Sequence, residues 1–180
     1  MGAPHNKERY GETWPAHKVI YGLQVLKELK PFVVISGGWA WHFMSPPGHV
    51  ELKHAHDHKD IDLFVEPIDV SMTIVKLKQM GFNKVWTKYD NLPSDEDFRR
   101  YEKTVTYDGH QFRVTIDFFI REVPHRKLAG GFRVVEPKTL LSFYSNIHSS
   151  DKCFAVQSAV RLLAAGIDPV GRPELVQIPD

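Results

Sequence analysis

The sequence predicts one mixed α+β domain, in which helices flank a β-sheet. Its 180 residues are enough for a single domain with its own hydrophobic core. Up to about residue 135, apolar residues at helical spacing alternate with short β-branched runs, and the pattern beyond is helical. The dipeptide Asp108-Gly109 between two alternating segments adds a β-hairpin. We expect a core domain over residues 14–135 and, as part of the same domain, C-terminal helices and an extended tail over residues 136–180.

The first half of the chain contains two amphipathic helices and two short strands. Val19, Leu23, Leu26 and Leu29 recur at helical spacing and stop before Pro31. A β-branched run follows and is broken by Gly37-Gly38. The expected elements are a helix over 16–29, a strand over 32–36, a short helix over 39–44, a strand over 60–65 and a helix over 67–80.

The second half is expected to carry the hairpin and the C-terminal helices. The elements are a weak strand near 85–86, a polar loop over 90–97, hairpin strands over 98–107 and 111–120, a loop over 121–131, a strand over 132–135, a helix over 137–147 and a last helix from Ser149 or Ser150 to Gly166. We expect Ile35, Ile61 and Ile116 on the side of the sheet that the helices over 16–29 and 67–80 cover.

Composition excludes several classes of protein. The 23 basic and 22 acidic residues give a formal net charge of +1, which excludes a polycationic nucleic-acid arm as the main device. The single cysteine, Cys153, cannot form an intramolecular disulfide and is typical of a reducing compartment. No apolar run approaches the roughly 18 residues of a transmembrane helix, and the N-terminal residues lack a signal-peptide pattern. We therefore expect a cytoplasmic protein with no membrane partner.

Three aspartates are expected on one face of the sheet. Side chains alternate along a strand, so Asp60 and Asp62 share the face opposite Ile61 and Leu63. Asp117 lies opposite the apolar face of the second hairpin strand and can join them if the two strands are neighbours. Adjacent carboxylates repel, and three oxygen ligands suit a hard cation such as magnesium better than zinc. The alternative for the Asp60/Asp62 pair is a solvated strand edge.

The hairpin brings further charges to this face. A two-residue loop pairs Tyr107 with His110, which places Arg100 opposite Asp117 and Glu102 opposite Thr115. Glu102 is then a candidate general base, and Arg100 a cross-strand ion-pair partner of Asp117. The alternative is a pair of exposed charges that contributes little. A longer loop would shift the register and remove this placement.

These motifs together resemble a known superfamily. The strand that ends at Gly37-Gly38 and opens a helix lets backbone N–H groups approach a phosphate. The segments SGGWAWHF, HKDIDLFV and RVTIDFFI follow in order. Over about residues 18–120 the chain thus resembles the polymerase β-like nucleotidyltransferases, whose pattern is Gly-Gly or Gly-Ser, then Asp-x-Asp, then a third acid. The GGWA opening and the short chain are most similar to the lincosamide and aminoglycoside nucleotidyltransferases that modify antibiotics.

The resemblance implies an enzyme with a nucleotidyltransferase-type mixed sheet. It would transfer a nucleoside monophosphate from a nucleoside triphosphate, ATP among them, to an acceptor hydroxyl and release pyrophosphate. Asp60, Asp62 and Asp117 would bind two Mg²⁺ ions, or Mn²⁺, and serve with Glu102 as catalytic residues. The triphosphate would be held by Ser36, Gly37 and Gly38.

Two groups of basic residues are further candidates for nucleotide binding. His54, His56 and His58 precede the Asp-x-Asp pair and depart from the plain family pattern. If this segment is extended they share the face of the aspartates, where protonated histidines, His58 above all, could donate to the triphosphate or bind a soft transition metal. The alternative is a solvated loop. The resemblance also suggests a basic residue from the C-terminal region, Lys152 or Lys138, at a phosphate.

The acceptor is open on sequence grounds. A small molecule such as an antibiotic is the leading acceptor. One alternative is a toxin-type nucleotidyltransferase that acts on tRNA or protein; the near-neutral charge counts mildly against a long RNA acceptor. The other is a catalytically inactive nucleotide-binding module, against which the presence of all three acids counts.

Overall fold

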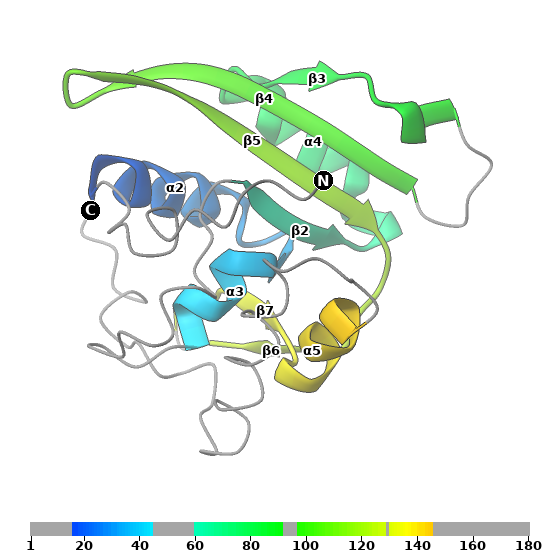
Figure 1. The fold of residues 1–180 in the computed structure, drawn as a ribbon. Helices are drawn as coiled ribbons and strands as arrows, with labels where there is room; N and C mark the ends of the chain where they lie inside the picture. Colours follow the sequence, from blue (N-terminus) through cyan, green and yellow to red (C-terminus); the bar gives the residue numbers. More distant parts are fainter. Residues whose placement is uncertain (1–15, 45–59, 92–96, 129, 146–180) are drawn as a thin grey trace, which may run out of the picture.

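The structure is a computed structural model that describes residues 16–44, 60–91, 97–128 and 130–145 (Figure 1). Its described part holds a seven-stranded sheet in the order β3-β4-β5-β2-β1-β7-β6. The β2/β5 and β1/β7 pairs are parallel and the other neighbours antiparallel, so the expected mixed α+β class is confirmed. The strands are β1 (Val34–Ser36), β2 (Ile61–Val65), β3 (Asn83–Val85), β4 (Asp97–Tyr107), β5 (His110–Ile120), β6 (His125–Lys127) and β7 (Arg133–Val135).

Helices pack on both faces of the sheet. The tip of the hairpin packs on α2, where the His17 and His110 rings stack with centroids 3.9 Å apart. On the opposite face, Phe143 of α5 lies 5.3 Å from Phe64 of β2. None of the helices in the described ranges combines the length and apolar composition needed to cross a bilayer. The helical elements are α2 (Ala16–Leu29), α3 (Gly37–Met44), η2 (Pro67–Asp69), α4 (Val70–Gln79), η3 (Lys88–Asn91) and α5 (Pro137–Ser145).

The main core lies between the sheet and helices α2 and α4. Ile35, Ile61 and Ile116 are at most 2% exposed, which confirms their predicted place on the core side. Each such side chain contributes about 1.5–3 kcal/mol relative to an exposed position. The packing fixes which face of each central strand is buried, and so which face carries the polar residues. The core residues from the two helices include Leu23, Leu26, Leu29 and Leu77.

The passage from β1 to α3 is tighter than predicted. The predicted end of the strand at Gly37-Gly38 is confirmed, while the helix expected from residue 39 begins two residues earlier, at Gly37, directly after β1 ends at Ser36. Gly37 has a φ of 59°, a left-handed conformation that lets the chain turn from strand to helix without a loop. Trp39 in the first turn is 1% exposed and packs on Gly22 of α2, so it serves as a core packing residue.

Elsewhere the elements differ from prediction mainly at their ends. Strand β6 falls in the predicted loop over 121–131, because its sequence His-Arg-Lys has no strand pattern of its own. It is held by antiparallel pairing with β7 and by the ion pair of Arg126 with Glu136 at 2.8 Å. The segment from Pro67 begins as a 3-10 turn before α4. The helix predicted after Ser149 lies outside the described residues, and the expected domain division stays a prediction.

Candidate functional site

One row of residues crosses the middle of the sheet on the face away from α2 and α4. Ser36 of β1 pairs with Asp62 of β2, Asp62 with Asp117 of β5, and Asp117 with Arg100 of β4. We call these four residues the acid row. Paired strands lie about 4.8 Å apart, so Asp62 and Asp117 are direct cross-strand neighbours. The condition set by the sequence, that β2 and the second hairpin strand are adjacent, is confirmed.

The turn of the hairpin sets this alignment. Asp108 and Gly109 have φ values of 50° and 74°, the conformation of a two-residue hairpin turn. Tyr107 pairs with His110, and the register runs on to the Arg100–Asp117 and Glu102–Thr115 pairs. The predicted register is therefore confirmed along the whole hairpin.

Arg100 binds both carboxylate oxygens of Asp117. Its Nε donates to Oδ1 at 2.7 Å and its Nη2 to Oδ2 at 2.8 Å. The Asp117 side chain is 9% exposed, and that of Arg100 is 37% exposed. The hydrogen bonds to Asp117, together with the negative charges of Asp117, Asp60 and Asp62, raise the pKa of the Arg100 guanidinium. The predicted ion pair is present, and it is a bidentate one.

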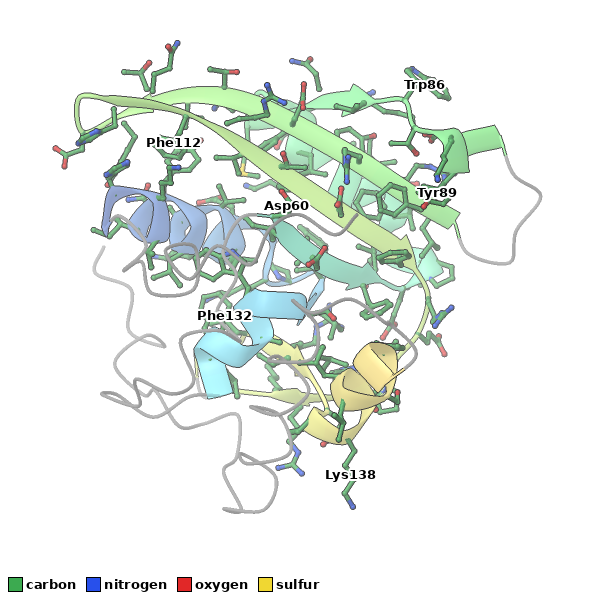
Figure 2. All side chains as sticks on the ribbon, viewed as in Figure 1. Asp60, Trp86, Tyr89, Phe112, Phe132 and Lys138 are labelled. Atoms are coloured by element: carbon green, nitrogen blue, oxygen red, sulfur yellow. The ribbon has the colours of Figure 1, made fainter. Side chains whose placement is uncertain are left out.

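Asp60 and Asp62 lie beside this pair at the start of β2. Both are half-buried, and Figure 2 places Asp60 in the middle of the sheet, where β2 begins beside β5. Asp62 lies against the first residue of α3, so close that a side chain on Gly37 would meet the Asp62 carboxylate. A carboxylate at this position is favoured by the partial positive charge of the helix N-terminus. The glycine thus brings the start of α3 and the Asp-x-Asp segment into contact.

The expected phosphate-binding residues meet the expected metal ligands here. Ser36 is 6% exposed at the end of β1, and Gly37 and Gly38 form the first turn of α3. Ser36 adjoins Asp62 through the strand pairing and Gly37 through its close contact, and Gly38 follows Gly37 in the helix. Of the basic candidates, His54, His56, His58 and Lys152 lie outside the described residues. Lys138 is exposed on α5 and extends far from Asp60 (Figure 2), so the structure does not bring it to the row.

Glu102 occupies the next position along the same face. It pairs with Thr115, two residues from the Arg100–Asp117 pair along both hairpin strands. Its Oε2 lies 3.8 Å from Nη1 of Arg113, and the Glu102 side chain is 39% exposed. The predicted shared face is confirmed, while its contact to Arg113 is the exposed charge pair of the alternative interpretation.

The sequence interpretation missed an aromatic row next to the acids. Phe64 and Phe119 follow Asp62 and Asp117 by two residues, and Phe98 precedes Arg100 by two residues on antiparallel β4. The three phenylalanines pair across β2, β5 and β4. Ring centroids are 5.8 Å apart for Phe64 and Phe119, and 5.1 Å for Phe98 and Phe119. Half-exposed Tyr89 packs edge-on against Phe98 at 5.5 Å. The i, i+2 spacing of Asp62 with Phe64 and of Asp117 with Phe119 was the available signal.

The acid row fits a hard cation only in part. Within the described residues, no group of three or more histidine, cysteine, aspartate or glutamate side chains is arranged to hold a metal ion. The bidentate contact with Arg100 engages both oxygens of Asp117. Asp60 and Asp62 offer the oxygen donors that Mg²⁺ prefers. The two-carboxylate part of the predicted site therefore fits a magnesium ion, whereas the charge of Asp117 is balanced by Arg100 in this structure.

Comparison with known proteins supports the fold. No family model and no curated protein matches the sequence. The fold resembles that of JHP933 from Helicobacter pylori. The TM-score is 0.53 at 12% identity, over 81% of this chain and 65% of JHP933. The Megavirus polyadenylate synthase matches with a TM-score of 0.41 at 14% identity, over 93% of this chain and 34% of the synthase.

Both matches are distant and partial. The chain spans less than two thirds of the length of either protein. At 12% identity, the likeness to JHP933 concerns the fold alone, and the match to the synthase carries no argument. Any activity therefore depends on the chemistry of the site itself.

Proposed function

We propose that the chain is a metal-dependent nucleotidyltransferase that moves a nucleoside monophosphate from a nucleoside triphosphate to an acceptor hydroxyl. The observation that carries this proposal is the acid row. Three motifs that lie far apart in the sequence, at Ser36-Gly37, Asp60-x-Asp62 and Asp117, meet on adjacent strands at the start of one helix. Such convergence of a helix N-terminus with carboxylates suits a bound polyphosphate and its cation.

The start of α3 would bind the phosphates. The backbone N–H groups of Gly37 and Gly38 and the hydroxyl of Ser36 can donate to phosphate oxygens at this helix N-terminus. Asp60 and Asp62 would hold the magnesium ion. When bound, this ion would neutralise charge on the phosphates and polarise the reacting phosphoryl group.

Asp117 would act on the acceptor. Its carboxylate can accept the proton of the hydroxyl as that oxygen forms its bond to the α-phosphorus and the bond to pyrophosphate breaks. Arg100 orients the carboxylate through two hydrogen bonds. Glu102, on the same face, is the second candidate base, although its distance along the strand favours Asp117.

A small molecule with an apolar part is the acceptor that the site supports best. Tyr89 and the aromatic row give an apolar surface next to the acids, against which such a molecule can pack. tRNA and protein acceptors are the alternatives. One observation also favours an inactive nucleotide-binding module: Arg100 engages both oxygens of the candidate base.

The test is label transfer. The protein is incubated with Mg²⁺ and each of the four α-labelled ribonucleoside triphosphates, separately with pooled small alcohols and aminoglycosides, with tRNA, and alone. We expect label on one acceptor class, and none with the Asp62→Asn variant, which should remain folded by circular dichroism. Magnesium-dependent triphosphate binding without transfer to any acceptor would favour the inactive module. No binding at all would reject the proposal.

A further inference from the structure

The ion pair between Arg100 and Asp117 has the geometry of a specific clamp. Two hydrogen bonds of 2.7 and 2.8 Å hold a carboxylate that is almost buried. Bidentate contacts of this kind are stronger and more directional than a single ion-pair contact. While Arg100 holds it, Asp117 keeps one lone pair on each oxygen, but its negative charge is already balanced, so a cation gains little from this carboxylate.

The guanidinium also lies in the field of the other two acids. The negative charges of Asp60 and Asp62 raise the pKa of the Arg100 guanidinium, as the charge of Asp117 does. On the two described hairpin strands, Glu102 and Arg113 also carry charge on this face, with Oε2 of Glu102 3.8 Å from Nη1 of Arg113. Arg100 thus supplies positive charge to the same three carboxylates from which the sequence predicted a metal site.

We propose that Arg100 and a divalent cation compete for Asp117. In the cation-free protein Arg100 holds Asp117, and a cation meets only Asp60 and Asp62. Asp117 becomes available to the cation when Arg100 turns away, which its half-exposed position on β4 permits. Arg100 is then a positioning residue that keeps metal affinity low in the absence of nucleotide. This inference rests on the proposed function, since it concerns the same carboxylates.

The test measures binding of Mn²⁺ alone to the nucleotide-free, full-length chain by electron paramagnetic resonance. Arg100→Gln should bind Mn²⁺ about tenfold more tightly than wild type, because a third carboxylate is released and a positive charge is removed. The double variant Arg100→Gln with Asp117→Asn should lose most of this gain. The double variant separates the release of Asp117 from a general change in protein charge.

Two further variants control the experiment. Arg126→Gln removes another arginine–carboxylate contact, in which Nε of Arg126 donates to both oxygens of Glu136 at 2.8 and 2.9 Å. This contact lies at the β6 edge of the sheet, so the variant should leave Mn²⁺ affinity unchanged. Arg100→Lys keeps the positive charge and loses the two-pronged contact, so it should show a smaller gain, about threefold. If circular dichroism shows that Arg100→Gln does not fold, the Mn²⁺ affinity of Arg100→Lys is compared with wild type instead.

The outcomes distinguish this inference from the proposed function. Tighter Mn²⁺ binding by the Arg100 variants supports competition, including the case in which wild type binds none. If wild type binds Mn²⁺ and the folded Arg100 variants bind it equally or less tightly, competition is rejected while the proposed function stands. If neither wild type nor any folded Arg100 variant binds Mn²⁺, competition is rejected, and the label-transfer test alone decides the proposed function.

Discussion

At the scale of single residues, the pairing of Asp117 decides what the site can do. The carboxylate is nearly buried, lies on the strand position paired with Asp62 and receives two hydrogen bonds from Arg100. These bonds restrict the carboxylate to one orientation, which favours its use as a base toward a positioned hydroxyl. They also give Asp117 a structural role, so substitution should affect stability and rate separately.

Asp117→Asn should slow transfer steeply and weaken the fold. The asparagine cannot accept a proton, and general-base catalysis is typically worth about 10²–10⁴-fold in rate. Loss of one charge-assisted contact to Arg100 should cost about 1–3 kcal/mol of unfolding free energy. Single-turnover transfer to the acceptor that label transfer identifies, and urea unfolding, measure the two effects. A rate within about threefold of wild type would reject the catalytic role and leave only the ion pair.

At the scale of elements, the start of α3 and the edge of the sheet show how local chemistry positions the site. Gly37 turns β1 into α3 with no intervening loop and leaves room for Asp62. At the edge strand β3, the carboxylate of Asp90 in η3 bonds Lys84 and also the backbone N–H of Thr87 at 2.6 Å. This contact fixes η3, and with it Tyr89, next to the aromatic row.

Gly37→Ala should destabilise the protein more than the same change at Gly109. Both glycines have a positive φ, 59° and 74°, so both variants strain the backbone by about 1–2 kcal/mol. Only at Gly37 does the added methyl also collide with Asp62, whose Cβ lies 2.9 Å from its position, whereas nothing lies within 4 Å at Gly109. Urea unfolding of the two variants measures the difference. Equal losses would contradict the close Gly37–Asp62 contact.

The Asp90 contact should make stability depend on acid pH. The hydrogen bond from Lys84, with those from Thr87, lowers the pKa of Asp90 to about 2 from the usual 3.8. Its contribution is therefore complete above about pH 4 and is lost as the pH falls toward 2. Asp90→Asn should cost about 1–3 kcal/mol at pH 6, and less at pH 2.5. Urea unfolding of both proteins across this range checks it; a deficit constant with pH would show that the Asp90 charge does not stabilise the fold.

At the scale of the whole molecule, the two faces of the sheet have different tasks. One face packs on α2 and α4 and forms the main core. The other carries the acid row and, beside it, the aromatic row, which joins the sheet to α5 through Phe64 and Phe143. The polar site is thus bounded on one side by a packed apolar cluster, which holds β2 and β5 in register.

Phe64→Ala should therefore destabilise the whole fold. Phe64 is 6% exposed and contacts rings from both β5 and α5, so its loss leaves a cavity that should cost about 3–5 kcal/mol. Trp86→Ala is the matched aromatic control, because Trp86 is 74% exposed and should cost under about 1 kcal/mol. Thermal unfolding compares them. Similar thermal unfolding midpoints for the two variants would argue against a stabilising packing contact between the sheet and α5 at Phe64.

The sequence by itself determined the local features of this protein. Alternation along Ile61–Val65 set Asp62 on the face opposite Ile61 and Leu63, because side chains of a strand point to opposite sides in turn. The Asp108-Gly109 turn fixed the hairpin register, since a two-residue turn leaves no freedom in the pairing that continues from it. Both features depend on residues close together in the chain.

Only the tertiary structure decided which distant segments meet. Nothing local makes β2 pair in parallel with β5, or gives β6 its place beside β7; both result from packing of the whole core. The packing also decided how the acids are used. The register predicted Arg100 opposite Asp117, but two opposite side chains can form a bidentate ion pair or merely lie side by side. Burial of the Asp117 carboxylate among neighbouring strands favours the bidentate contact, because a buried charge needs hydrogen-bond partners.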